Sequence, residues 1–172
     1  MTISQLSGNY VPEEDRVLFR LTTKQSEEFR LWFSRAVVKD ILKLGQQSLL
    51  LSSTRTHSAE HATDMAQFKQ QAAAENTKFS EFVPCEEFPL GKDPLLVKSV
   101  ALLVHADSTE LDMSLVGNKS FKIKLTDALI GQLVVLLQKL ADNAKWAIEA
   151  PTPSDPVMPA VSESPIAAKK LH

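Results

Sequence analysis

Two histidines and a glutamate lie close together in the segment His57-Ser58-Ala59-Glu60-His61. On a helix, residues four positions apart project from the same face, so His57 and His61 could hold one metal ion. Glu60 would then lie beside the metal and could polarise a metal-bound water for hydrolysis. The segment could carry metal chemistry on a helix, but a polar helix surface is the favoured interpretation.

The spacing of this segment resembles the H-x-x-E-H pattern of the inverted zinc peptidases. The resemblance implies a zinc-dependent hydrolase in which a third ligand and an open coordination position complete the site. No downstream segment of this chain is typical of a ligand-bearing helix, and the flanking residues are polar rather than apolar. His57 and His61 therefore stay candidate metal ligands, and a zinc-dependent hydrolase at His57, Glu60 and His61 ranks last among our hypotheses.

Other catalytic patterns are absent from the sequence. It contains no G-x-S-x-G motif, and its five glycines form neither a phosphate-cradling loop nor a dinucleotide fingerprint. Cys85 is the single cysteine, which excludes an internal disulfide and a multi-cysteine zinc site. We expect Cys85 to be a buried or unreactive thiol. These absences favour a non-enzymatic function, and no cofactor is predicted.

Two groups of residues could instead form a binding surface. Arg35, Lys39 and Lys43 recur every four residues on a predicted helix and could meet phosphate or an acidic partner, unless they are simply a solvated helix face. The second group is the sheet face opposite the core, which would present an aliphatic patch with a basic rim: Leu18, Leu103, Val116, Arg16, Arg20, Lys122 and Lys124.

An aliphatic patch with a charged rim is typical of a protein contact. The predicted face has no aromatic side chain on which bases could stack, so nucleic acid is the less favoured partner. A third interpretation is that the chain's own middle segment covers this face.

Hydrophobic periodicity predicts the elements that position these residues. Residues Arg16–Leu21 alternate between apolar and polar faces, which predicts a strand. A possible capping box at Thr22 and apolar residues at helical spacing predict a helix over 24–44 that ends near Gly45. Residues 52–94 are expected to form a polar helix and then a proline-containing extended connection.

Three closely spaced strands are predicted as an antiparallel meander, over residues 97–106, 110–116 and 119–125. Thr126 is a candidate N-cap for the last helix, and Trp32 and Trp146 are expected in the core or at its rim. The predicted fold class is α+β, a four-stranded antiparallel sheet in the order β-α-(α)-β-β-β-α, with the helices packed on one face. Residues 1–149 are expected to form a single domain, and residues 150–172 a disordered proline-rich tail.

The composition fits one ordinary globular domain, because 172 residues with 44% hydrophobic content suffice for a core. With 19 basic and 21 acidic residues, the chain has no overall charge that attracts nucleic acid or anionic lipid. No apolar run approaches the roughly 18 to 20 residues that cross a bilayer. The first twelve residues lack the basic and apolar segments of a secretion signal. We therefore expect a cytoplasmic protein without membrane contact.

The segments Glu14–Leu21, Glu28–Trp32 and Leu125–Leu129, together with Trp146, resemble small bacterial α+β proteins of unknown function. The resemblance implies no activity. We expect a non-enzymatic interaction or assembly module that acts through protein–protein contacts and self-associates as a homo-oligomer. The alternative is a nucleic-acid-associated regulatory protein that uses the same basic residues.

Overall fold

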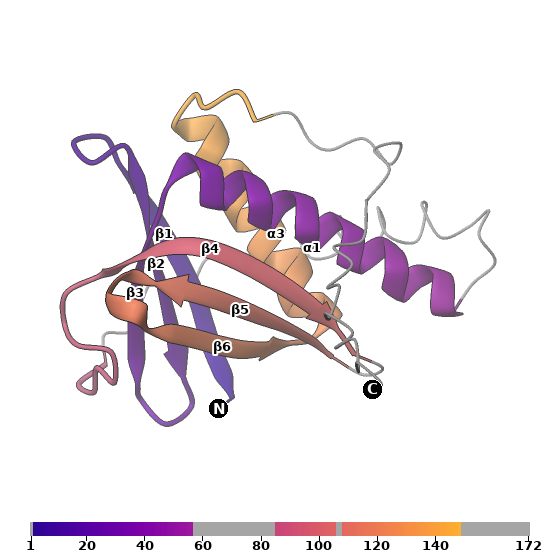
Figure 1. Cartoon of the computed structure of the whole chain (residues 1–172), viewed down its shortest axis with the longest axis horizontal. Helices are drawn as coiled ribbons and strands as arrows, with labels where there is room; N and C mark the ends of the chain where they lie inside the picture. Colours follow the sequence, from indigo (N-terminus) through magenta and orange to yellow (C-terminus); the bar gives the residue numbers. More distant parts are fainter. Residues whose placement is uncertain (1, 57–84, 106–107, 149–172) are drawn as a thin grey trace, which may run out of the picture.

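The computed structural model describes residues 2–56, 85–105 and 108–148, and the candidate metal ligands His57 and His61, with Glu60, lie outside these ranges. So do the predicted tail and most of the predicted polar helix. Strands and helices follow one another in this order (Figure 1): β1 (Ile3–Val11), β2 (Arg16–Thr23), β3 (Glu28–Phe33), α1 (Arg35–Thr56), β4 (Leu95–Val104), β5 (Thr109–Leu115), the short 3-10 turn η1 (Val116–Asn118), β6 (Ser120–Leu125) and α3 (Asp127–Asn143).

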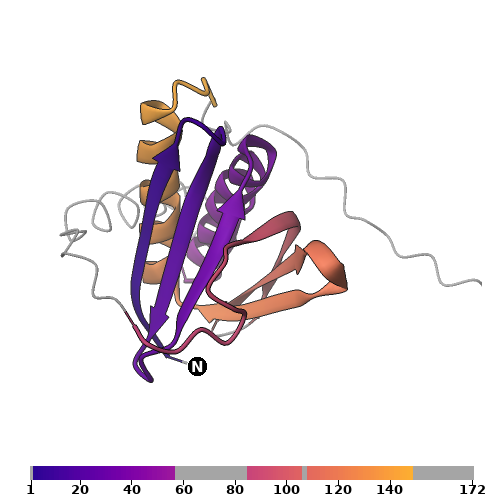
Figure 2. The ribbon, with the colours of Figure 1, turned by 90° about the vertical axis from the view of Figure 1, so that its left-hand side faces the viewer.

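The strands of the described ranges form one six-stranded sheet in chain order, β1 to β6. Neighbouring strands are antiparallel except β3 and β4, which are parallel and joined through α1. Figure 2 shows β4–β6 turned away from β1–β3, with both helices on one side of the first three strands. The α+β class is confirmed, whereas the expected four-stranded, wholly antiparallel sheet is wrong, because the chain contributes two further strands.

One of these further strands, β3, occupies the first half of the predicted helix over 24–44. Of the two residues that resemble a capping box, Thr22 lies in β2, paired with Glu28, and Gln25 lies in the tight turn between β2 and β3. There the Thr23 amide donates to the Glu27 carbonyl at 3.0 Å, and Ser26 has a positive φ of 62°. The helix that does follow begins at Arg35 and continues through Gly45 to Thr56.

Gly45 permits close packing of the two helices rather than ending α1. A Cβ atom at this position would lie 2.6 Å from Cγ2 of Val134 on α3, which is closer than two carbon atoms can approach. The glycine therefore marks the crossing of α1 and α3.

The side chains of β3 alternate between the two faces of the sheet. Phe29, Leu31 and Phe33 are buried in the core, whereas Arg30 and Trp32 are half-buried on the opposite face. This period of two is the geometry of a strand. The expectation that Trp32 belongs to a helix is therefore wrong, and Trp32 lies neither in the core nor among the apolar residues packed against it.

The other unpredicted strand, β1, is rich in small polar residues. Its register places Leu6, Gly8 and Tyr10 opposite buried residues of β2. A Cβ atom at Gly8 would lie 2.8 Å from Cδ1 of Leu140, so α3 packs closely over this strand. The glycine, which breaks the apolar alternation in the sequence, makes room for the helix.

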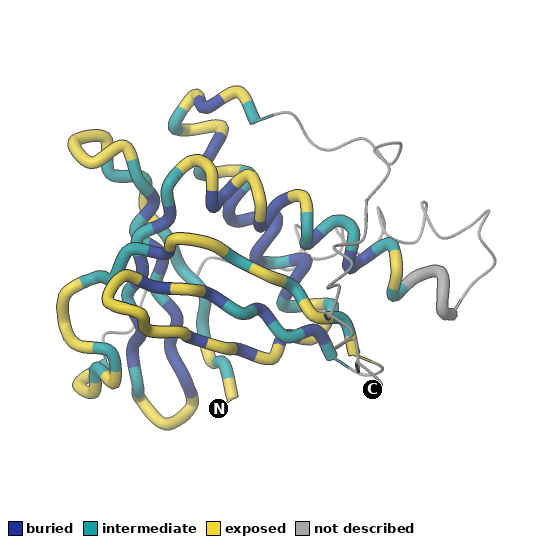
Figure 3. Tube along the Cα trace, in the orientation of Figure 1, coloured by how far each residue is buried: buried dark blue, intermediate teal, exposed yellow. Residues whose placement is uncertain are grey.

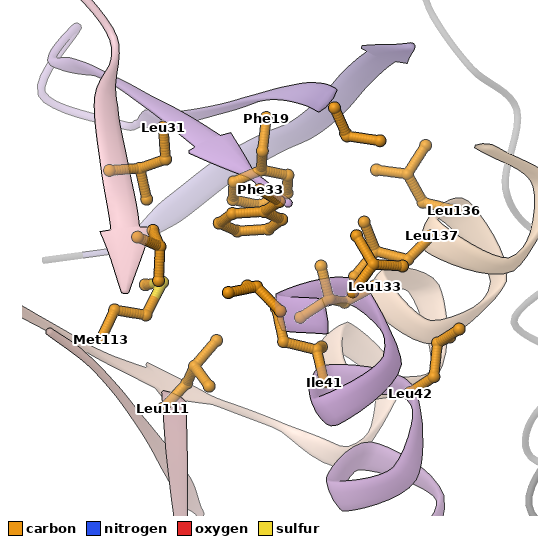
Figure 4. Close-up of a cluster of buried hydrophobic side chains, with 14 of the residues drawn as sticks. Phe19, Leu31, Phe33, Ile41, Leu42, Leu111, Met113, Leu133, Leu136 and Leu137 are labelled. Atoms are coloured by element: carbon orange, nitrogen blue, oxygen red, sulfur yellow. The ribbon is translucent and has the colours of Figure 1, made fainter. Parts of the chain in front are cut away.

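The core lies between the sheet and the two helices. Phe19 and Phe33 stack at its centre with ring centroids 4.8 Å apart, and Ile41 of α1 and Leu137 of α3 lie close to them (Figure 4). Figure 3 shows the buried positions where strands and helices face one another. The predicted meander is confirmed as β4–β6, and so is the N-cap of α3, where Oγ1 of Thr126 accepts from the Leu129 amide at 3.4 Å.

Asp15 links the turn between β1 and β2 to the chain that follows α3. Its Oδ1 accepts hydrogen bonds from Nε1 of Trp146 at 2.8 Å and from the Tyr10 hydroxyl at 2.9 Å. The rings of Tyr10 and Trp146 meet edge to face, 5.5 Å apart. The bond from Trp146, followed by that from Tyr10, lowers the pKa of Asp15 below its ordinary value. The ionised carboxylate therefore stabilises the folded state.

This link predicts a pH-dependent difference between the native protein and an Asp15→Asn variant. Because the pKa of Asp15 is lower in the folded state, its contribution is complete above the ordinary carboxyl pKa of about 3.9. It is lost as the pH falls through the lowered value. We expect Asp15→Asn to reduce the free energy of unfolding at pH 7, and the reduction to shrink below about pH 4. Urea unfolding of the native protein and of Asp15→Asn at several pH values measures the loss of stability and its change with pH. A loss that is the same at every pH would contradict the stabilising role of the ionised Asp15 carboxylate.

Candidate functional site

Apolar side chains cross the face of the sheet that points away from the helices. Leu18 on β2 lies directly opposite Trp32 on β3, and Trp32 lies opposite Leu96 on β4. Paired residues project from the same face of a sheet. The core and the apolar residues packed against it include none of these three, and each is half-buried. We call Leu18, Trp32 and Leu96 the outer row.

Val116 extends the outer row on its β5 side. Val97 of β4 is paired with Leu115, the last residue of β5, and Val116 follows it as the first residue of the turn η1, next to the strand position of Leu96. The Val116 side chain is 37% exposed. Leu103 is 47% exposed but lies opposite Glu110 near the other end of β4, roughly 20 Å from Leu96 at the rise of a strand. The structure thus brings Leu18 and Val116 into one region and leaves Leu103 outside it.

Basic residues lie on both sides of the outer row. Arg16 precedes Leu18 by two positions, and Arg20 follows it by two and is paired with Arg30 on β3. Arg16 contacts Glu14 at 3.4 Å, but both side chains are well exposed, so this ion pair contributes little. The first half of the face therefore combines an apolar centre with a basic rim.

An ion pair between a buried glutamate and a half-buried arginine lies at one end of this face. The side chain of Glu28 is 0% exposed, and its Oε1 accepts from Nε of Arg30 at 2.7 Å. Its second oxygen, Oε2, has no hydrogen-bond partner among the residues that the structure describes. Arg30 also donates to the Lys92 carbonyl at 3.1 Å and lies over the ring of Phe88 at 4.6 Å. Arg30 is therefore held in place by its own chain.

The segment between residue 85 and β4 covers this end of the face. The Glu28 amide donates to the Glu87 carbonyl at 2.8 Å, which holds the segment at the edge of β3, and the ring of Phe88 then packs against Arg30 on the outer face. In Figure 2 the segment runs on the near side of β1–β3, away from the helices. The chain's own middle segment therefore covers the face at the end around Glu28, as the third interpretation expected. The outer row lies beyond it and reaches the surface.

Cys85 lies in the covering segment and is half-buried. Burial raises the pKa of its thiol, and the charge of Glu28 raises it further. A protonated thiol is a poor nucleophile and a poor metal ligand. Within residues 2–56, 85–105 and 108–148, no three histidine, cysteine, aspartate or glutamate residues gather in a way that could hold a metal ion.

The part of the outer face formed by β5 and β6 carries both acidic and basic side chains. Nζ of Lys122 lies 2.8 Å from Oδ2 of Asp112 and 3.7 Å from Oε1 of Glu110. The hydrogen bond and charge of Asp112, with a smaller effect of Glu110, raise the pKa of Lys122. Lys124 is exposed and paired in register with Glu110. The predicted basic residues Lys122 and Lys124 thus lie beside the acids of the neighbouring strand β5.

The basic stripe of Arg35, Lys39 and Lys43 is exposed along α1. Because α1 lies on the opposite side of the sheet from the outer row, the structure separates this stripe from the other predicted contact residues (Figure 2). The two predicted binding surfaces are therefore two different faces of the molecule.

The sequence reasoning missed Trp32, Leu96 and Arg30 as residues of the outer face. The available signal was the alternation of charged and apolar residues over Glu28–Phe33. It was overlooked because Phe29, Phe33 and Val37 also recur at the four-residue spacing of a helix.

No protein-family model, curated protein or solved structure matches this chain. The resemblance to bacterial proteins therefore stays a prediction. None of the helices in the described ranges is long and apolar enough to cross a membrane.

Proposed function

We propose that this protein is a non-enzymatic interaction module that binds a partner protein through the outer row. The observation that supports the proposal is the row itself, since Leu18, Trp32 and Leu96 lie side by side on three strands without packing on the core. Tryptophan and arginine are the residue types most enriched at binding hot spots. An apolar centre with a polar rim is also the usual composition of a protein contact.

Two variants test the contact and a third controls for it. Trp32→Ala and Leu18→Asp change the outer row, whereas Leu103→Asp places the same new charge at an exposed position of the same sheet, outside the row. Each full-length protein is immobilised and exposed to a cell lysate, and the retained proteins are compared quantitatively. We expect at least one protein to be retained by the native chain and by Leu103→Asp.

The two row variants should retain that protein at least about tenfold less, since truncating a hot-spot residue typically costs 2 kcal/mol or more. Retention that is equal for all four proteins, or no specific retention by the native chain, contradicts the proposal. Circular dichroism of the variants checks that each is folded.

Nucleic acid is the second candidate partner, and one observation favours it more than the sequence did. Trp32 supplies an aromatic ring on the same face as Arg16 and Arg20, and single-stranded nucleic acids bind by stacking bases on such rings beside basic side chains. This function predicts binding of a single-stranded oligonucleotide that weakens steeply as salt is added. Absence of binding at low salt would dispose of it.

A further inference from the structure

The charges around the outer row limit which partners it can accept, and this inference rests on the function proposed above. Five basic residues of the strands and their turns lie within three positions of a row residue or of Val116: Arg16, Arg20, Arg30, Lys98 and Lys119. Arg35 is equally close in sequence but belongs to α1. Three acids lie beside these residues: Glu14 contacts Arg16, Glu28 is buried against Arg30, and Asp93 is exposed. Asp15 is bonded to Tyr10 and Trp146 instead. The five basic residues outnumber these three acids, so the rim has an excess of positive charge.

A second copy of this chain is a poor occupant of such a surface. In a two-fold symmetric contact the same patch meets itself, so the basic rim of one copy would face the basic rim of the other. Like charges placed opposite one another across an interface are destabilising. If the expected homo-oligomer forms, we expect it to use another surface.

The aliphatic character of the row favours a polypeptide over a nucleic acid. Leu18, Leu96 and Val116 offer methyl groups, and Trp32 is the single aromatic ring among the row residues. Non-specific binding of single strands depends on several stacked bases, for which successive aromatic side chains are needed. Apolar side chains of a protein partner would pack on this surface better than bases.

We infer that the outer row binds an acidic segment of a partner protein, with apolar side chains at its centre and carboxylates around them. The carboxylates would meet Arg16 and Arg20 at the β2 end of the row, and Lys98 and Lys119 at the other end, beside Leu96 and Val116. Complementary rim charges speed association and select the partner, whereas the apolar centre supplies most of the affinity.

Synthetic probes test this inference on the full-length protein. Three fluorescent ligands are compared by anisotropy at low and physiological salt: a peptide of alternating leucine and glutamate, a peptide of the same length with lysine in place of glutamate, and single-stranded oligothymidylate. The protein variants are Arg16→Glu with Lys119→Glu, and Lys124→Glu with Lys122→Glu as the matched control. Both pairs change the net charge equally, and the control pair lies on the other half of the face.

The inference predicts that the acidic peptide binds in preference to both other ligands and more weakly in salt. The rim variant should bind it about tenfold less tightly, and the control variant as the native protein does. No saturable binding of the acidic peptide, equal binding of the lysine peptide, or tighter binding of oligothymidylate overturns it. One further outcome is a partner protein that depends on Trp32 for binding and yet binds with the same affinity in high salt and to the rim variant. That result overturns this inference and leaves the proposed function standing.

Discussion

Replacing Phe33 with alanine is expected to lower the free energy of unfolding by about 4 kcal/mol, whereas Trp32→Ala should cost about 1 kcal/mol or less. Phe33 is 0% exposed, stacks on Phe19 and lies at the centre of the core (Figure 4). Removing its ring deletes that buried apolar surface and leaves a cavity between the sheet and the helices. Trp32 is the adjacent residue, but it projects from the outer face and packs outside the core.

Denaturant unfolding of the two variants measures this difference directly. The comparison also distinguishes the observed strand from the helix that the sequence suggested, in which both aromatic residues were expected at the core. Equal losses of stability at the two positions would contradict the assignment of β3. The same experiment shows whether Trp32→Ala is folded. Only if it is folded does its weaker binding mean that a contact has been lost.

The second large effect is expected at the ion pair of Glu28 with Arg30. Arg30→Ala removes the partner of Glu28 and leaves a carboxylate that is 0% exposed without its counter-charge. Removing one member of a buried pair typically costs 3 to 5 kcal/mol. The lower end, about 3 kcal/mol, applies here, because Arg30 itself is 31% exposed and water can reach the site that it leaves.

A double variant separates this charge effect from lost packing. Glu28→Gln combined with Arg30→Ala removes both charges, so it should be more stable than Arg30→Ala alone in the same denaturant experiment. If the double variant is the less stable of the two, the cost comes from the contacts of Arg30 with Phe88 and Lys92 rather than from the unpaired carboxylate.

The elements that the sequence predicted correctly are those with an unambiguous period. The alternation of Arg16–Leu21 and the meander of β4–β6 have a period of two, and α3 combines a cap at Thr126 with a wide apolar face. β1 was not predicted because Gly8 takes an apolar position between Leu6 and Tyr10 and so breaks the alternation. Gly8 is required by the close approach of α3, a tertiary contact that local sequence does not reveal.

The candidate site was predicted in part for the same reason. Leu18, Arg16 and Arg20 belong to β2, the strand that was assigned correctly, and they lie on the expected outer face. Trp32 was assigned to the wrong element and therefore to the wrong face. Leu96 joins the row only through the parallel pairing of β3 with β4, a long-range contact whose partner strand cannot be read from either segment alone.

The measurement that tests the outer row most directly is the emission of Trp32 in a Trp146→Phe protein, where Trp32 is the only tryptophan left. The captured partner is titrated into this protein, and its binding is followed independently by calorimetry. A partner that covers the row removes water from the indole ring, so we predict a blue shift and protection from acrylamide quenching that saturate together with binding. Saturated binding with unchanged emission and unchanged quenching would place the contact elsewhere and contradict the proposed function.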